Sequence, residues 1–230
     1  LTLKPDIAGI GTAVSSAAYD NTLKQLDGTS MASPYVAGCV AVFDQYLRQN
    51  GTELTGAEKT DLIKNIMMNS AVLFMNGDVY ESPRRQGAGL VNMKNALNDR
   101  VILTGETGLA KVELKDNITS QLSFDVDIRN FTDEDVEFSE AKLVLTAEDG
   151  APAEDSEQLT ISGASNIGVT ADLSDLLTAS AQESRTVNIN AELSADDLAA
   201  HSTAFPNGFF VEGYIILSGA ENCCDISVPV

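Results

Sequence analysis

The spacing of apolar residues changes near residue 100, and this change is what most constrains the fold. Before it, apolar side chains recur at the three- and four-residue spacing of helices, whereas after about Val101 they alternate with polar ones. The charge changes at the same place. Residues 1–100 hold 9 Lys and Arg against 10 Asp and Glu, and residues 101–230 hold 5 against 24. We therefore predict two structural parts, residues 1–100 and 101–230, joined within residues 98–107.

The first part is predicted to be mostly helical. One helix is expected over residues 30–49, with Pro34 in its first turn, where a missing N–H is tolerated. Because this helix is apolar almost all round, we expect it to be buried. A second helix should begin at Thr55, where the hydroxyl and the glutamate three residues on form a capping-box pattern, and should end near Asn69. A third fits residues 93–97.

The second part is predicted to be an antiparallel β-sandwich. Its apolar and polar residues alternate in short runs separated by Asp, Asn, Gly and Ser, a pattern typical of half-buried strands. Roughly seven such strands in a stretch of this length suit a sandwich. Residues 194–197 are expected to start a helical turn. The clearest strand runs are residues 111–114, 122–128, 142–145, 186–189, 209–217 and 226–230.

Composition excludes several classes of function. A formal net charge of −20 argues against binding to nucleic acid or to an anionic membrane surface, since both need Lys and Arg. No apolar run is long enough for a membrane-spanning helix. The three cysteines give neither a disulfide framework nor a metal-binding pair, so we expect unpaired thiols. Cys39 should be buried, and the adjacent Cys223 and Cys224 should point to opposite faces of a strand.

The segment that carries chemistry is residues 27–34, where a loop containing Gly28 enters the first helix. A serine there, Ser30, lies beside free backbone N–H groups at the positive end of the helix dipole, which is where an oxyanion is stabilised. Gly28 lets the backbone approach a substrate closely. From these residues alone a second interpretation stays open, because a serine at the start of a helix is often only its N-cap.

This segment also carries a resemblance to a known family. Residues 28–34, Gly-Thr-Ser-Met-Ala-Ser-Pro, resemble the nucleophile motif of the subtilisin-like serine proteases, and residues 4–7 resemble the strand before it. Residues 82–92 are similar to the end of the catalytic domain in the cell-envelope branch, which contains lactocepin and complement-cleaving surface peptidases. Residues 206–214 resemble a strand region of the fibronectin-type-III-like domain that follows in that branch.

The resemblance implies a fold and a function. The expected fold is the C-terminal part of a subtilisin-like α/β parallel-sheet domain, followed by an all-β fibronectin-type-III-like sandwich. The implied activity is an extracellular or cell-envelope serine endopeptidase that acts on protein or peptide substrates. Ser30 corresponds to the nucleophile and its backbone N–H to one oxyanion donor, while Gly28 and Thr29 shape the loop. We expect no cofactor and no metal at the site; structural calcium is possible but not indicated by the sequence.

One departure from the family is decisive. In subtilisin-like proteases the catalytic Asp and His precede the serine, but none of the 29 residues before Ser30 is a histidine. The single histidine, His201, is expected to be an ordinary surface or loop residue. We therefore expect a fragment that is inactive alone and needs the N-terminal portion of the same protease. The alternative is a non-catalytic surface binding or adhesion module that uses the sandwich.

The expected lack of the N-terminal portion also has a consequence for how the first part folds. Without the rest of a parallel sheet, the first part would expose the apolar surface of residues 36–47. We expect this surface to pair with the missing portion, to self-associate or to rearrange.

The remaining sequence features are not expected to form functional sites. The acidic residues 132–135 and 196–197 are expected to be solvated turns rather than calcium loops. Arg84 and Arg85 could grip a carboxylate but are expected to form surface ion pairs. Three Asn-x-Thr sequences, at residues 50, 117 and 130, are expected to arise by chance.

Overall fold

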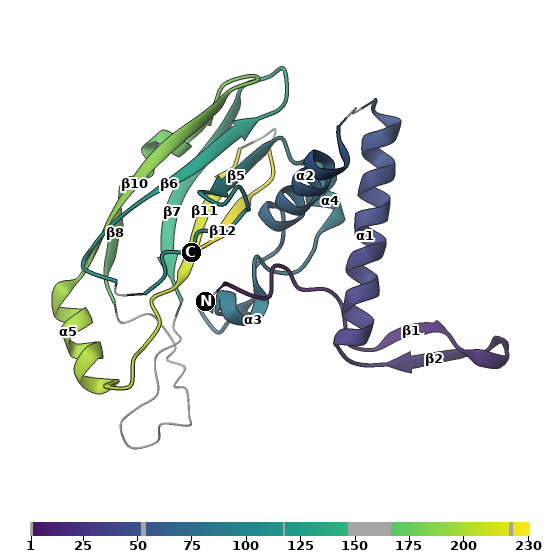
Figure 1. Ribbon diagram of the computed structural model, residues 1–230, viewed down its shortest axis with the longest axis horizontal. Helices are drawn as coiled ribbons and strands as arrows, with labels where there is room; N and C mark the ends of the chain where they lie inside the picture. Colours follow the sequence, from purple (N-terminus) through teal and green to yellow (C-terminus); the bar gives the residue numbers. More distant parts are fainter. Residues whose placement is uncertain (1, 52–53, 117, 147–166, 221–222) are drawn as a thin grey trace.

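The computed structural model describes residues 2–51, 54–116, 118–146, 167–220 and 223–230. Figure 1 shows a helical part, drawn purple to blue, beside a β-sandwich drawn teal to yellow. A hairpin of β1 (Val14–Ala17) and β2 (Leu23–Leu26) projects from the helical part on the side away from the sandwich (Figure 1).

The described helices of the first part follow the predicted pattern closely. Thr55 caps α2 with the predicted capping box, in which its hydroxyl accepts the Glu58 N–H and the Glu58 carboxylate accepts the Thr55 N–H at 3.0 Å. The helices pack through the side chains of Phe43, Ile66 and Ala96. Their bounds are α1 (Thr29–Gln49), α2 (Gly56–Asn69), α3 (Pro83–Gln86) and α4 (Met93–Asn98).

The prediction that α1 is a buried helix is wrong in this structure. A single stripe of α1 is buried, and its members are spaced four residues apart: Cys39, Phe43 and Leu47. Outside this stripe, four large apolar side chains of α1 are 37% to 54% exposed: Tyr35, Val42 and Tyr46 on one side of the stripe, and Val40 on the other. The side formed by Tyr35, Val42 and Tyr46 is called the open face of α1 below. The predicted exposure of the surface at residues 36–47 is confirmed for Val40, Val42 and Tyr46, whereas Cys39, Phe43 and Leu47 within it are buried.

The position of Pro34 also differs from the prediction. Because α1 begins at Thr29, Pro34 is its sixth residue and lies in the second turn rather than the first. A proline there cannot donate the backbone hydrogen bond that the carbonyl of Ser30 would otherwise accept.

Short extended segments connect these helices. Ala8 bridges Leu90 in the parallel sense, with the Ala8 N–H donating to the Gly89 carbonyl at 2.8 Å. Leu90 in turn bridges Val72 in the antiparallel sense. Two further strands, β3 (Met75–Asn76) and β4 (Val79–Tyr80), form a small hairpin. The first part thus combines helices with a short parallel pairing.

The second part consists of two antiparallel sheets that enclose a common core. Large side chains fill the space between them, including Leu103, Ile128, Ile189 and Leu217, which are all fully buried. The first sheet has the order β5 (Val101–Gly105), β6 (Gln121–Asn130), β10 (Ser184–Leu193) and β8 (Val169–Ala171). The second has the order β12 (Ile226–Pro229), β11 (Gly213–Gly219), β7 (Val136–Leu145) and β9 (Thr178–Ala179).

The alternating pattern located most of these strands but not all. Residues 111–114 are extended without belonging to a strand, although the Val112 N–H donates to the Pro229 carbonyl at 2.8 Å. Residues 209–212 also lie outside β11. The predicted runs over residues 122–128, 142–145, 186–189 and 226–229 are confirmed within β6, β7, β10 and β12.

A helix that is longer than the predicted helical turn lies at one end of the sandwich (Figure 1). Ser194 caps α5 (Ala195–Ala204) and accepts the Asp197 N–H at 3.3 Å, as the predicted helical turn requires. His201 lies on this helix and is buried against the rings of Phe205 and Phe209. The expectation that His201 is a surface or loop residue is therefore wrong, because the two aromatic rings cover it.

Two buried asparagines of α2 fasten the helical part to the sandwich. The Asn69 amide nitrogen donates to the carbonyls of Leu103 and Ser227, at 3.0 and 3.1 Å, and its amide oxygen accepts the Leu103 N–H at 3.0 Å. Asn65 binds the backbone of the loop after β5 in the same way, through Gly108 and Ala110. Each amide thus satisfies backbone groups that the sheet leaves unpaired.

Candidate active site

Ser30 is the second residue of α1, and Gly28 is the N-cap residue. Gly28 has a φ of 135°, a conformation that glycine adopts without strain but other residues rarely do. No side chain caps this helix, so the interpretation of Ser30 as an N-cap is wrong. The first backbone N–H groups of a helix have no acceptor within it. The exposed Ser30 therefore lies at the positive end of the dipole of α1.

Two glycines upstream let the chain pass close to this loop. The Gly28 N–H donates to the carbonyl of Gly11 at 2.7 Å. A Cβ atom at Gly11 would lie 2.8 Å from the Gly28 carbonyl oxygen, and one at Gly9 would lie 2.8 Å from that of Ala32. The backbone of residues 9–11 therefore packs directly against the backbone at the start of α1. The role of Gly9 and Gly11 was not predicted, and their two-residue spacing after Asp6 is the one sequence signal that could have indicated it.

Neither Asp6 nor His201 is placed to act on Ser30: Asp6 is held in ion pairs with lysines, and His201 lies on α5. Asp6 forms ion pairs with Lys4 and with Lys111, whose Nζ lies 3.3 Å from Asp6 Oδ1. Burial would raise the pKa of Asp6, but hydrogen bonds and charge from Lys4 and Lys111 outweigh it and lower that pKa. His201 lies on α5, on the opposite side of the molecule from α1 (Figure 1). The structure does not bring Ser30 together with the one histidine of the sequence.

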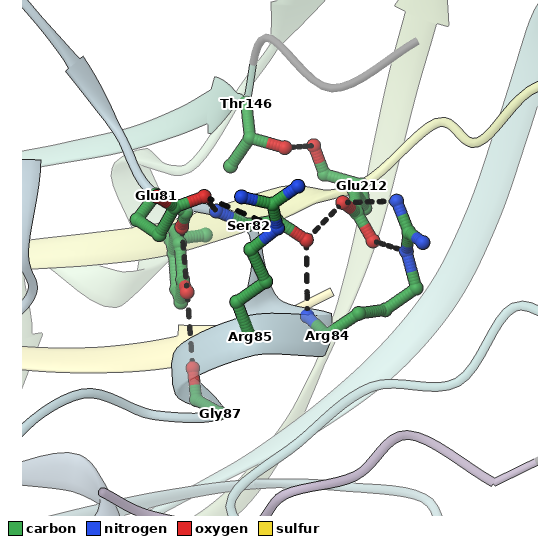
Figure 2. Close-up of polar contacts among 8 residues, drawn as sticks. Glu81, Ser82, Arg84, Arg85, Gly87, Thr146 and Glu212 are labelled. Atoms are coloured by element: carbon green, nitrogen blue, oxygen red, sulfur yellow. Dashed lines mark hydrogen bonds and ion pairs between the residues drawn. The ribbon is translucent and has the colours of Figure 1, made fainter. Parts of the chain in front are cut away.

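A second polar cluster joins the two parts of the chain, and Figure 2 shows it. Arg84 Nε donates to Glu212 Oε2 at 2.8 Å, and an Arg84 terminal nitrogen donates to Glu212 Oε1 at 3.2 Å. The Ser82 hydroxyl donates to the same carboxylate at 2.5 Å. The Arg84 guanidinium also stacks 3.6 Å above the centre of the Phe210 ring. These four residues are called the Glu212 cluster below.

The Glu212 cluster distinguishes between the two interpretations of Arg84 and Arg85, which were binding of a buried carboxylate and surface ion pairing. Arg84 pairs with the carboxylate of Glu212, whose side chain is only 8% exposed, so the expectation of a surface ion pair is wrong for Arg84. Arg85 does pair near the surface, 3.8 Å from Glu81. Glu212 was not predicted as a partner because Arg84 and Glu212 belong to motifs far apart in sequence, residues 82–92 and 206–214.

Contacts continue from this cluster toward the segment that precedes Ser30. The Tyr214 hydroxyl lies 3.0 Å from the Gly87 carbonyl oxygen and 3.2 Å from that of Glu81. Burial raises the pKa of Tyr214, which keeps this hydroxyl neutral. A Cβ atom at Gly87 would lie 2.4 Å from the carbonyl oxygen of Pro5. The sandwich therefore contacts residues 81–87, and Gly87 in turn packs against Pro5 and Asp6, which begin the segment that leads to the Ser30 loop.

The acidic turns bind protein donors. Asp135 accepts the Ala181 N–H at 2.8 Å, Asp133 accepts from the Gln182 amide at 3.1 Å, and Glu134 pairs with an arginine. Within the described residues, no three His, Cys, Asp or Glu side chains are grouped to hold a metal ion. No described helix combines the length and apolar character that crossing a membrane requires.

The Asn-x-Thr sequences differ in their surroundings. Asn130 is buried, and its amide donates to the carbonyls of Glu134 and Ala179 at 2.8 and 3.0 Å, which leaves it inaccessible to a glycan. Residues 52 and 117 of the other two sequences lie outside the described residues.

Comparison with known proteins decides the family. A model described as the Subtilase family matches residues 1–92, and one described as an Fn3-like domain matches residues 112–230, more than half of the chain. This chain combines a Subtilase-family segment with an Fn3-like domain. The predicted family and fold class are confirmed.

The relatives of this chain are named as a peptidase and a proteinase, and both are much longer than the chain. The C5a peptidase of Streptococcus pyogenes is 28% identical over 215 residues, which cover 93% of this chain and 18% of that protein. The PI-type proteinase of Lactococcus lactis subsp. cremoris is 35% identical over 146 residues, covering 57% of this chain and 8% of the proteinase. The chain thus spans less than a fifth of the length of these relatives.

Proposed function

We propose that this chain carries the nucleophile of a serine endopeptidase that cleaves protein or peptide substrates outside the cell or in the cell envelope. One observation supports this most strongly: Ser30 is exposed at the uncapped start of α1, two residues after Gly28, which has a positive φ. The match to the subtilase family over residues 1–92 supports the same chemistry.

In this proposal Ser30 performs the covalent step. Its Oγ attacks the scissile carbonyl, an acyl-enzyme forms, and the amine side of the substrate leaves. The Ser30 backbone N–H donates to the oxyanion, where the partial positive charge of the helix start also stabilises negative charge. Gly28 and Thr29 hold the loop open for the substrate backbone. No metal or cofactor takes part.

The base that accepts the Ser30 proton is proposed to lie outside these 230 residues. A serine hydroxyl is a weak nucleophile without an adjacent base, and the one histidine here is buried on α5. Subtilases that lose a triad member keep only about 10³–10⁴-fold catalysis over water. The chain by itself is therefore proposed to be inactive.

The N-terminal portion of the same protease is proposed to supply both that base and the cover for the open face of α1. That face presents the apolar side chains of Tyr35, Val42 and Tyr46 in the turns that follow Ser30. The relatives are more than five times longer than the matched region, which leaves ample chain for such a portion. The sandwich is proposed to brace the catalytic part through the Glu212 cluster.

The test compares proteolysis by the longest natural polypeptide that contains this sequence with that of its S30A and S33A variants. We expect the natural protein to cleave unfolded casein, S30A to lose at least a thousandfold in rate, and the neighbouring S33A control to stay active. An S30A variant as active as the natural protein would refute the assignment of Ser30. A natural protein that cleaves nothing yet binds a surface partner through the sandwich would favour the adhesion module.

A further inference from the structure

A cavity of about 430 Å³ lies between α1, α2 and α4, which are neighbours in Figure 1. Its wall is mainly apolar and includes the buried Phe43 and Ile66, together with Leu97 of α4 and Phe131, which follows β6. Tyr46 belongs to the same wall and is 39% exposed, so the cavity reaches the surface. Sites for small molecules are typically mostly apolar cavities of about 300–1,000 Å³ with a few polar groups that orient the ligand. The size and the lining of this cavity therefore suit a small molecule.

The wall also contains Arg129 of β6, whose exposed side chain forms no ion pair or hydrogen bond within the described residues. The other arginines of the sequence all form ion pairs. Arg129 is paired in register with Ile102 of β5, and residues paired in this way point to the same face of a sheet. Because Ile102 packs in the core between the helices, Arg129 also faces the helical part.

The two acidic residues of the wall, Glu58 and Asp99, are engaged with other groups. The Glu58 carboxylate accepts the Thr55 N–H at 3.0 Å and the Thr55 hydroxyl at 2.6 Å. Asp99 accepts the Val101 N–H at 3.2 Å, and burial raises the pKa of Asp99 well above its ordinary value, which favours its neutral form. The wall therefore presents an unpaired positive charge beside an apolar surface.

We propose that this cavity binds a small alkyl carboxylate such as decanoate, whose apolar chain fills the cavity and whose carboxylate pairs with Arg129. A planar guanidinium matches the geometry of a carboxylate and donates two parallel hydrogen bonds to it. Removal of the apolar chain from water supplies the rest of the affinity. Phe43 lies roughly 20 Å along α1 from Ser30, at about 1.5 Å per residue. The proposal does not depend on the proposed peptidase activity.

The test is a calorimetric titration of the folded chain with decanoate below its micelle concentration. We expect one decanoate to bind per chain. Decanol has the same alkyl length but no charge and should bind at least tenfold more weakly, whereas acetate lacks the apolar chain and should not bind detectably. A chain that does not bind decanoate, or that binds decanol equally well, would overturn the proposal.

Two charge variants test the position of the carboxylate. R129Q removes the unpaired guanidinium and should weaken decanoate binding at least tenfold. R48Q is the matched control, because Arg48 is an exposed arginine of α1 that pairs with Asp44 and lies outside the cavity wall. Its affinity should stay within twofold of that of the natural chain. Equal losses in the two variants would show that only the overall charge attracts decanoate, and would refute the role of Arg129.

A third variant tests the position of the alkyl chain. L97W places a larger side chain in the cavity wall and should weaken decanoate binding at least tenfold without changing the far-ultraviolet circular dichroism. A folded L97W variant with natural affinity would show that the alkyl chain lies elsewhere. The R129Q and R48Q pair tests the proposal even if L97W does not fold.

Other occupants of the cavity give different results. Tyr46 belongs both to the cavity wall and to the open face of α1, so the titration is repeated on the longest natural polypeptide that contains this sequence. We expect that polypeptide to bind decanoate with the same affinity. If it does not bind while the 230-residue chain does, another part of the protein fills the cavity and the proposal fails. V42E changes the open face outside the cavity wall, and loss of binding in V42E would place the site between two copies and overturn the proposal.

Discussion

Arg84 and Glu212 form an ion pair across the boundary between the helical part and the sandwich, with the Glu212 side chain only 8% exposed. Glu212 lies two residues before the fully buried Tyr214, whose hydroxyl reaches the backbone at Gly87. The two parts are therefore joined by polar contacts as well as by packing, and the contacts lie on residues 82–87, of which Gly87 packs against the segment that leads to Ser30.

Replacing Glu212 should destabilise the chain substantially. In E212A the Arg84 guanidinium and the Ser82 hydroxyl would lose their shared acceptor while remaining largely shielded from water. Removing one member of a buried ion pair costs about 3–5 kcal/mol. Urea unfolding of the 230-residue chain should show a loss of roughly 3 kcal/mol.

The matched control removes an exposed ion pair. Glu140 pairs with Lys142 on β7, where both side chains are well exposed. E140A should therefore cost less than about 1 kcal/mol. If E212A and E140A lower the free energy of unfolding equally, the Glu212 cluster does not hold the two parts together.

Stability should fall at acid pH because of Glu113. Burial would raise the pKa of Glu113, but hydrogen bonds from Lys115, the Leu3 N–H and Lys111 outweigh it and lower that pKa to about 2 from its ordinary 4.5. The stabilisation from ionised Glu113 is thus complete above about pH 4.5 and is lost as the pH falls toward 2. The urea midpoint should decline across this window, and E113Q should flatten the decline.

The exposed Glu106 provides the control for this pH profile. E106Q should keep the slope of the natural chain between pH 4.5 and 2. An E113Q profile parallel to that of E106Q would contradict the role given to Glu113.

Asp99 should make the stability of the chain depend on pH in the opposite direction from Glu113. Burial, and then the nearby Cys224, raise the pKa of Asp99 well above its ordinary value, and Asp99 Oδ2 has no hydrogen-bond partner in the structure. Above about pH 4 the unfolded chain releases this proton while the folded chain retains it, so stability falls as the pH rises. D99N keeps the oxygen that accepts the Val101 N–H and should remove this fall. A D99N midpoint that changes with pH as the natural midpoint does would refute the assignment.

The open face of α1 should make the isolated chain self-associate. Val42 is 54% exposed on this face, and burying such side chains against a second copy removes apolar area from water. Light scattering should show a mass that rises with concentration for the natural chain, whereas V42E should remain monomeric.

A control separates this face from the hairpin. Leu23 on β2 is 80% exposed, so L23E removes an equally apolar side chain elsewhere. L23E should still self-associate. If L23E is monomeric and V42E is not, the hairpin rather than α1 mediates the association.

Local pattern predicted much of this fold. The capping box at Thr55 located the start of α2, and alternation located β6 and β10, because these signals depend only on neighbouring residues. The burial of α1 could not be predicted from its composition, since burial depends on what packs against a helix. For the same reason His201 was misplaced: its cover comes from Phe209, which follows the end of α5.

The candidate site was predictable only in part. The motif at residues 28–34 identified Ser30, and the structure places it at the start of a helix as the motif requires. The Glu212 cluster was not predicted because Arg84 and Glu212 are far apart in sequence, and no local pattern indicates which carboxylate an arginine will meet. Gly9 and Gly11 were missed because their role appears only when the backbone of α1 lies against them.

The most direct test of the account is to label the longest natural polypeptide containing this sequence with a fluorophosphonate probe and to map the modified residue. The account predicts one adduct, on Ser30, that is absent when the 230-residue chain is labelled alone. An adduct on another serine, or no adduct on a folded natural protein, would contradict the claim that Ser30 is the nucleophile of a serine endopeptidase.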